Sequence, residues 1–153
     1  MVQIPKWLLI SFVLVSFTGF LDSSFLSLEH YNRGILPCYI FSGCDEVTAS
    51  RYATVAGVPI SLAGATFYLS ILIAAIFYLD TKNAKALKIL KFLPAVGFLA
   101  SLWLLFLQFF IIKAICFYCI LSLVSSTMLF ILGLYLFVLL KKDRKREWDG
   151  KIV

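Results

Sequence analysis

The chain has 153 residues, of which 62% are hydrophobic and 14% are charged. Soluble globular domains are roughly half apolar and a quarter charged, so this composition excludes an ordinary soluble domain. The formal net charge of +6 comes mostly from basic residues beside long apolar runs, a pattern typical of membrane orientation signals rather than of nucleic-acid binding.

Four apolar runs are each long enough to cross a bilayer as a helix, which takes about 20 residues. They cover approximately residues 7–28, 58–79, 92–112 and 115–140. The first run is too long for a secretory signal peptide, and no cleavage site of small residues closes it. Because the four runs nearly exhaust the chain, we predict an all-α membrane protein with a single four-helix transmembrane domain over residues 1–153.

The longest polar stretch joins the first two runs and contains Cys38 and Cys44. Pro37 and Gly43 are turn residues, so this segment should be irregular and able to bend. After it, Asp45 is suited to cap a helix that is too short and too polar to span the membrane. We therefore predict a loop followed by a short half-helix on the membrane surface.

The fourth run begins with ICFYC, which places Cys116 and Cys119 in the first turn of the predicted helix. Unpaired amide groups and the helix dipole lower the pKa of a thiol at a helix start, which suits a disulfide that cycles. With a rise of about 1.5 Å per residue, Cys119 lies about 4.5 Å deeper than Cys116. The deeper sulfur should face the lipid zone and the shallower one the water.

Basic residues distinguish the two sides of the predicted bundle. Eleven of the 14 lysines and arginines lie before the first run, between the second and third, or after the fourth, and only Arg33, Arg51 and Lys113 lie on the other side. By the positive-inside rule, both termini of this multi-pass protein of the cell (inner) membrane should be cytoplasmic. All four cysteines then lie on the extracytoplasmic side, where disulfides persist.

The four cysteines have three possible uses. The first is a zinc or iron–sulfur site with His30 as a further ligand. Such a site usually takes a second Cys-x-x-Cys, and the loop pair has five residues between its cysteines. The second is two inert structural disulfides, which the oxidising side permits. A structural disulfide is unusual at the lipid edge, because the bilayer already holds the helices together. Electron transfer from a soluble thiol protein, through both pairs, to a lipid-soluble quinone accounts for both positions, and we favour it without a bound metal.

The sequence contains few candidates for a quinone site. Gln108 lies about 7.5 Å below the outer end of the third run, near the depth of Cys119. It is suited either to hydrogen-bond a quinone carbonyl or to join two helices. Phe109 and Tyr118 are candidates for the walls of the site. Asp22 lies near the outer end of the first run, where a carboxylate is suited either to reach the interface or to serve the site, as ionisable residues at depth often do.

The segment CYIFSGCDEVTASRYATVAGVPISLAG, followed by CFYC on the last run, resembles the vitamin K epoxide reductase family. The resemblance extends from about residue 19 to residue 140 and is closest to bacterial and archaeal members. It consists of the spacing of the loop cysteines, Ser50 six residues after Cys44, the Gly-Val-Pro that opens the second run, and the final Cys-x-x-Cys.

The resemblance implies a four-helix bundle around a quinone (ubiquinone or menaquinone), capped by the loop and half-helix. It implies an oxidoreductase similar in function to DsbB, which takes electrons from a thioredoxin-like protein of the DsbA type and supports disulfide-bond formation. Cys38 would exchange with this partner, Cys44 would relay electrons to Cys116, and Cys119 would face the quinone. Ser50 would help to cap the pocket.

Two departures from family patterns bear on the partner and the substrate. Many bacterial members carry a fused thioredoxin-like domain, which is not expected here, so the partner should be a separate extracytoplasmic protein. Vertebrate members carry an asparagine and a tyrosine whose counterparts here are Ile60 and Leu123. This difference argues against vitamin K epoxide as the physiological substrate and leaves quinone reduction unaffected.

Overall fold

The structure is a computed structural model that describes residues 4–32, 50, 53–55 and 57–149. Long helices make up most of it, namely α1 (Lys6–Asn32), α3 (Ile60–Thr81), α4 (Ala84–Phe106) and α5 (Phe117–Asp149), and a π-helical segment, η2 (Leu107–Ile112), continues α4. Four candidate spans, each long and apolar enough to cross a membrane, lie in these helices. The predicted all-α fold with four membrane-spanning helices is therefore confirmed.

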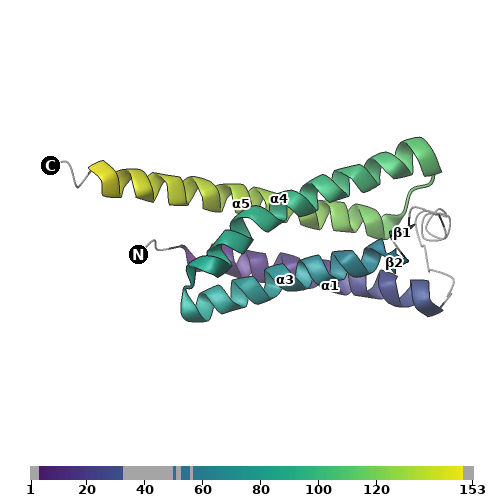
Figure 1. Cartoon of the computed structure of the whole chain (residues 1–153), viewed down its shortest axis with the longest axis horizontal. Helices are drawn as coiled ribbons and strands as arrows, with labels where there is room; N and C mark the ends of the chain where they lie inside the picture. The colour runs from purple at the N-terminus through teal and green to yellow at the C-terminus, as the bar shows by residue number, and fades with distance from the viewer. Residues whose placement is uncertain (1–3, 33–49, 51–52, 56, 150–153) are drawn as a thin grey trace.

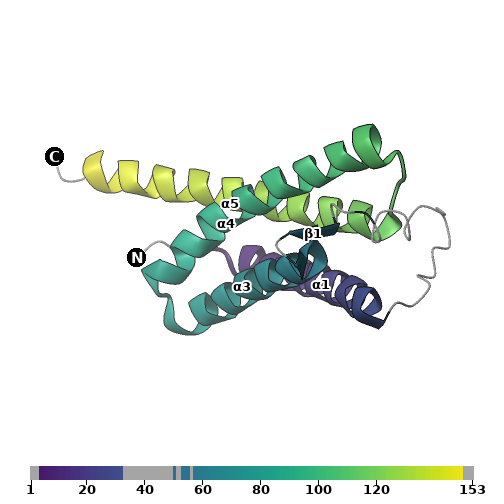
Figure 2. The ribbon, with the colours of Figure 1, turned by 45° about the vertical axis from the view of Figure 1, so that its right-hand side comes forward.

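The helices form a bundle in which each one packs against two others. α1 packs against α3 and α5, and α4 packs against the same two helices. The start of α1, the end of α5 and the α3–α4 connection lie at one end of the bundle, and the α4–α5 connection lies at the other (Figure 1). We call these the terminus end and the loop end. From their connection at the terminus end, α3 and α4 diverge toward the loop end in both views (Figure 2).

The helix that contains the third apolar run begins before that run. It starts at Ala84, because Asn83 caps it by accepting a hydrogen bond from the Lys85 amide at 2.9 Å. Lysine is a good helix former, so Lys88 and Lys91 extend the helix although they are not apolar. The basic segment is thus helical and adjoins the terminus end.

A small antiparallel ladder precedes α3. It pairs β1 (Thr54–Val55) with β2 (Val58–Pro59), and the turn includes Gly57 at a φ of 81°. Glycine adopts this left-handed conformation without the strain that a side chain would cause. Most of the segment predicted to form the half-helix lies outside the described residues, so the half-helix stays a prediction.

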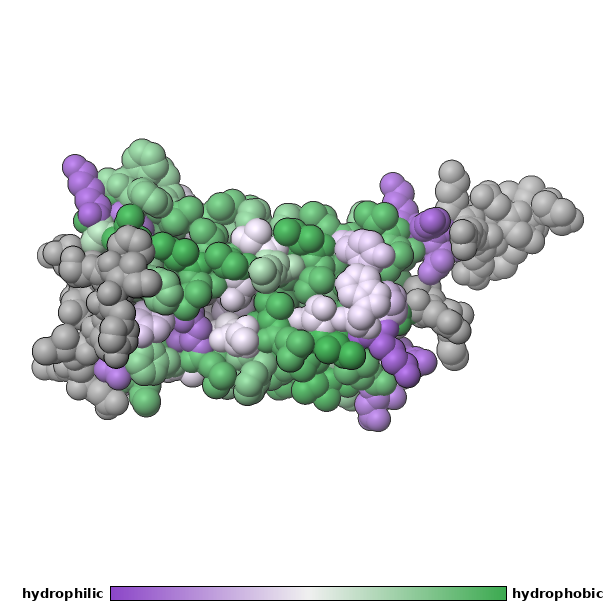
Figure 3. Space-filling model, turned by 180° about the vertical axis from the view of Figure 1, so that it is seen from behind, coloured by the Kyte–Doolittle hydropathy of each residue, from purple (hydrophilic) through white to green (hydrophobic). Residues whose placement is uncertain are grey.

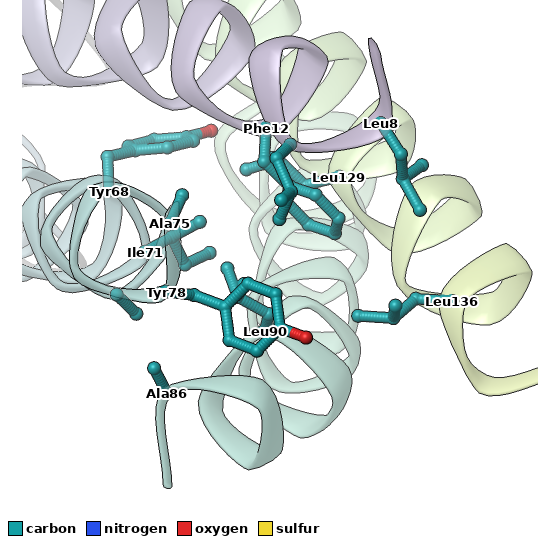
Figure 4. Close-up of a cluster of buried hydrophobic side chains, with 12 residues drawn as sticks. Leu8, Phe12, Tyr68, Ile71, Ala75, Tyr78, Ala86, Leu90, Leu129 and Leu136 are labelled. Atoms are coloured by element: carbon teal, nitrogen blue, oxygen red, sulfur yellow. The ribbon is translucent and has the colours of Figure 1, made fainter. Parts of the chain in front are cut away.

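The hydrophobic core lies toward the terminus end of the bundle. It brings together side chains such as Phe12 of α1, Ile71 of α3, Leu90 of α4 and Leu129 of α5, all fully buried (Figure 4). Tyr68 closes this cluster on the side of the loop end. Its ring packs against Gly19, where any side chain would collide with it.

The outer surface of the bundle is apolar, as a membrane-spanning protein requires. Large hydrophobic side chains, including Leu14, Val96, Trp103 and Ile131, are exposed along the helices. In the view of Figure 3, hydrophobic residues cover most of the middle of the molecule and strongly hydrophilic ones gather mainly near its ends. Apolar side chains that face outward in this way match a lipid environment.

Candidate functional site

A cavity of about 300 Å³ lies in the half of the bundle nearer the loop end. Its walls come from all four long helices, where α3 and α4 diverge and the core no longer fills the interior. Most of the lining is apolar, including Leu26, Phe67 and Leu104, and a few polar side chains project into it. This combination of an apolar wall with few polar groups is typical of small-molecule sites.

The Cys-x-x-Cys pair lies beside this cavity. Cys119 lines the cavity, whereas Cys116 is fully buried in a small cluster with Leu26, Ile112 and Ala114. Both are free thiols in the structure. The structure therefore gives the two sulfurs different surroundings, with only the deeper one adjoining the cavity.

Cys116 occupies the capping position at the start of α5. Its carbonyl accepts a hydrogen bond from the Ile120 amide at 3.2 Å, and its sulfur accepts from the amides of Tyr118 and Cys119. A side-chain acceptor in this position satisfies amide groups that the helix leaves unpaired. The sequence motif thus generates its own thiolate-stabilising site.

These contacts change the acidity of Cys116, which lies just outside the fourth span. The hydrogen bond from the Cys119 side chain is the largest contribution and, with the Cys119 and Tyr118 amides, it outweighs burial and lowers the pKa of the Cys116 thiol to about 7. An ordinary cysteine has a pKa of about 8.5. At neutral pH, Cys116 is therefore the more readily ionised sulfur and the better nucleophile toward a disulfide.

We expect the ultraviolet thiolate absorbance of the inner pair to rise with a midpoint near pH 7. Because the pKa is lowered, the thiolate is populated above this pH and is lost as the pH falls below it. The measurement uses reduced protein in which Cys38 and Cys44 are replaced by alanine. Adding Cys119→Ala should move the midpoint toward the ordinary value, whereas Cys119→Ser, which keeps a donor, should not. A midpoint that Cys119→Ala leaves unchanged would contradict the assignment.

Gln108 connects the third span to both cysteines. It lies in η2, is 3% exposed, and accepts a hydrogen bond from the Cys116 amide through Oε1 at 3.5 Å. Its side chain also hydrogen-bonds Cys119. Single π-helical turns occur frequently at functional sites, where they redirect side chains. Here the π-helical segment carries Gln108 into the cavity.

The structure places three of the four residues predicted for the quinone site at the cavity. Ser50, Gln108 and Tyr118 line it. Phe109 does not line it, and its side chain is 55% exposed on the outside of the bundle. This placement argues against the predicted role for Phe109, because the neighbouring Gln108 takes the inward direction. Cys38 and Cys44 lie outside the described residues.

The cavity also contains a polar pair that sequence reasoning missed. The Tyr68 hydroxyl donates a hydrogen bond to the Ser122 carbonyl at 2.9 Å and lies 3.1 Å from the Ser122 hydroxyl. Both residues line the cavity. Ser122 follows Cys119 by three residues, a spacing that places both on one helix face and was the available signal. Ile60 and Leu123 also line the cavity, as apolar groups.

Among the described residues, no group of three or more histidine, cysteine, aspartate and glutamate side chains is placed to hold an ion. Two of the four cysteines considered for a metal site, Cys38 and Cys44, lie outside the described residues. His30, the candidate extra ligand, lines the cavity instead.

A comparison with protein-family models identifies one match. The model of the vitamin K epoxide reductase family matches residues 10–134, which include parts of all four long helices and the cavity between them. The chain belongs to the vitamin K epoxide reductase family. No curated protein matches it.

Membership in the vitamin K epoxide reductase family indicates the general activity of the protein. Members are membrane thiol–disulfide oxidoreductases and are generally quinone-linked, so the chain is a redox enzyme of a membrane. The free Cys-x-x-Cys pair beside an apolar cavity is the arrangement that such chemistry needs. The predicted family is therefore confirmed.

Proposed function

We propose that this protein oxidises a separate, thioredoxin-like extracytoplasmic protein and delivers the electrons to a membrane quinone. Cys38 exchanges with the partner, Cys44 passes the electrons to Cys116, and Cys119 adjoins the quinone. One observation carries the proposal: Cys119 opens onto the cavity while its redox partner Cys116 is buried next to it at a helix start. The enzyme thereby supports disulfide-bond formation, as DsbB does.

The cavity suits a quinone, which has a flat apolar ring and two carbonyl oxygens that accept hydrogen bonds. Gln108 carries amide donors within the cavity, and Tyr118 and Phe67 supply aromatic surface. The hydrogen bond from Tyr68 to Ser122 holds two polar side chains of the cavity wall in place. A quinone held there supplies an acceptor for the two electrons of the Cys116–Cys119 pair.

The proposed orientation places both termini in the cytoplasm and the loop end outside. Lys82 and the lysines of α4 lie toward the same end of the bundle as the start of α1 and the end of α5, which agrees with the positive-inside pattern of the sequence (Figure 1). The cavity and the inner cysteines lie toward the opposite end. In this orientation a soluble partner reaches the cysteines from the oxidising compartment.

The test is quinone reduction by the purified protein. Given a reduced thioredoxin-like protein of the DsbA type and a short-chain ubiquinone or menaquinone, it should consume one quinone for each dithiol oxidised. The matched control is the variant with all four cysteines replaced by serine, which should show only the uncatalysed rate. If the wild-type protein consumes neither quinone above that rate, the proposed function is wrong.

A further inference from the structure

Asp22 is a carboxyl group deep in a membrane helix, and the relay of cysteines does not use it. It lies in the first span, ten residues before the end of α1 at Asn32, which corresponds to about 15 Å of helix. Its side chain lines the cavity. The other aspartate that the structure describes in the spans before the last, Asp80, is exposed near the terminus end of α3, where a charge meets water.

The described residues around Asp22 do not supply a lysine or arginine that would stabilise its charge. Among the described residues that line the cavity, none is lysine or arginine, and the basic side chain there is His30, two helical turns away on the same face of α1. Ionisable residues at such depth are costly and mark functional sites by default. A carboxyl group here lowers that cost by carrying a proton.

Asp22 lies within electrostatic range of the redox centre. Its charge interacts with Tyr68 on α3 and with both Cys116 and Cys119 at the start of α5. In the described elements, the other titratable side chains that line the cavity are His30, Tyr68, Tyr118 and Cys119. The carboxyl group therefore shares the cavity with the Cys119 thiol, which gives up a proton when the inner pair is oxidised.

We propose that Asp22 is the proton carrier of the quinone-reducing step, an inference that rests on the proposed function. Oxidation of the inner pair forms one S–S bond and releases two electrons and two protons. Reduction of a quinone to a quinol consumes the same numbers of each. Asp22 takes the proton of the Cys119 thiol and donates a proton to one quinone oxygen. The second proton comes from water at the loop end, where Cys116 released its own on ionisation.

The experiment compares Asp22→Asn, which cannot carry the proton, with Asp22→Glu, which can. The pre-reduced inner pair is mixed with a short-chain quinone, and its oxidation is followed. We expect Asp22→Asn to lower this rate by about 100-fold, the usual size of a general-acid contribution, while Asp22→Glu keeps most of it. Glu29→Gln removes a carboxyl group from the same helix that does not line the cavity, and it should leave the rate unchanged.

A second readout needs no quinone. Infrared spectra of the quinone-free protein should contain a protonated-carboxyl band that Asp22→Asn removes and Glu29→Gln preserves. The affinity for an unreactive quinone analogue should remain within about twofold of the wild type, because a proton carrier acts on the rate rather than on binding. If Asp22→Asn does not fold, absence of this band from the wild type and from Asp22→Glu would overturn the proposal.

The outcomes separate this inference from the proposed function. A wild-type protein that reduces no quinone overturns both. A wild-type protein that reduces quinone, together with an Asp22→Asn variant of equal rate, overturns only the role of Asp22. A slow Asp22→Asn variant that has lost quinone affinity in proportion also overturns it, since Asp22 would then act in binding.

Discussion

Replacing Cys38 and Cys119 together with alanine should trap a disulfide between Cys44 and Cys116 in nearly all molecules. The two substitutions remove the thiols that normally compete for these partners, so the exchange intermediate cannot resolve. Cys116 is suited to this bond because its thiolate is stabilised at the start of α5, and this start lies at the loop end. Mass spectrometry of the oxidised protein, digested without reduction, would identify the linked peptides.

The control for this trap is the pair of substitutions Cys38→Ala and Cys116→Ala. It leaves Cys44 with Cys119, which lies one helical turn deeper and opens onto the cavity. A disulfide requires Cα atoms within about 7 Å, so this pair should link in far fewer molecules. Free Cys44 and Cys116 in the first variant under oxidising conditions, or equal linkage in the two variants, would exclude the relay through Cys116.

Cys119→Ala should abolish electron delivery to quinone, with a loss of about 1,000-fold or more, the scale typical for removing a reacting group. Cys119 is the inner thiol that lines the cavity, and no other sulfur among the described residues does so. The loop pair should still exchange disulfides with the thioredoxin-like partner. Cys38→Ala should give the opposite pattern, in which the inner pair reacts with quinone and the partner is no longer oxidised.

The measurement separates the two half-reactions. One assay follows quinone consumption by the pre-reduced enzyme, and the other follows oxidation of the partner in the absence of quinone. Each single variant should lose one half-reaction and keep the other. Full partner-coupled activity in either variant would show that electrons bypass that cysteine.

The sequence predicted the number and order of the spans because lipid exposure demands long apolar runs, and these are visible without a structure. It did not predict that the helix of the third span starts at Ala84, since a lysine-rich segment can be helical without being apolar. Asn83 caps this start, but one asparagine is a weak signal in the sequence. Helix ends depend on such local hydrogen bonds more than on composition.

The sequence predicted how deep the site residues lie in the bundle, but not which way their side chains point. Rise per residue placed Gln108 near Cys119, and the structure joins them by a hydrogen bond. Which way Phe109 faces depends on the π-helical turn of η2, which departs from the regular helical period and leaves no composition signal. Tyr68 and Ser122 meet across 54 residues of sequence, so their contact follows only from the packing of α3 against α5.

The core fills the half of the bundle at the terminus end, and the cavity lies in the half at the loop end. This arrangement bears on how the enzyme interacts with the membrane potential. The cavity and the inner cysteines share the loop end, and the core closes the terminus end. Moving one elementary charge across a potential of 100 mV is worth about 2.3 kcal/mol, and a relay confined to one half avoids that term. In the proposed orientation, thiol oxidation therefore neither draws on the membrane potential nor adds to it.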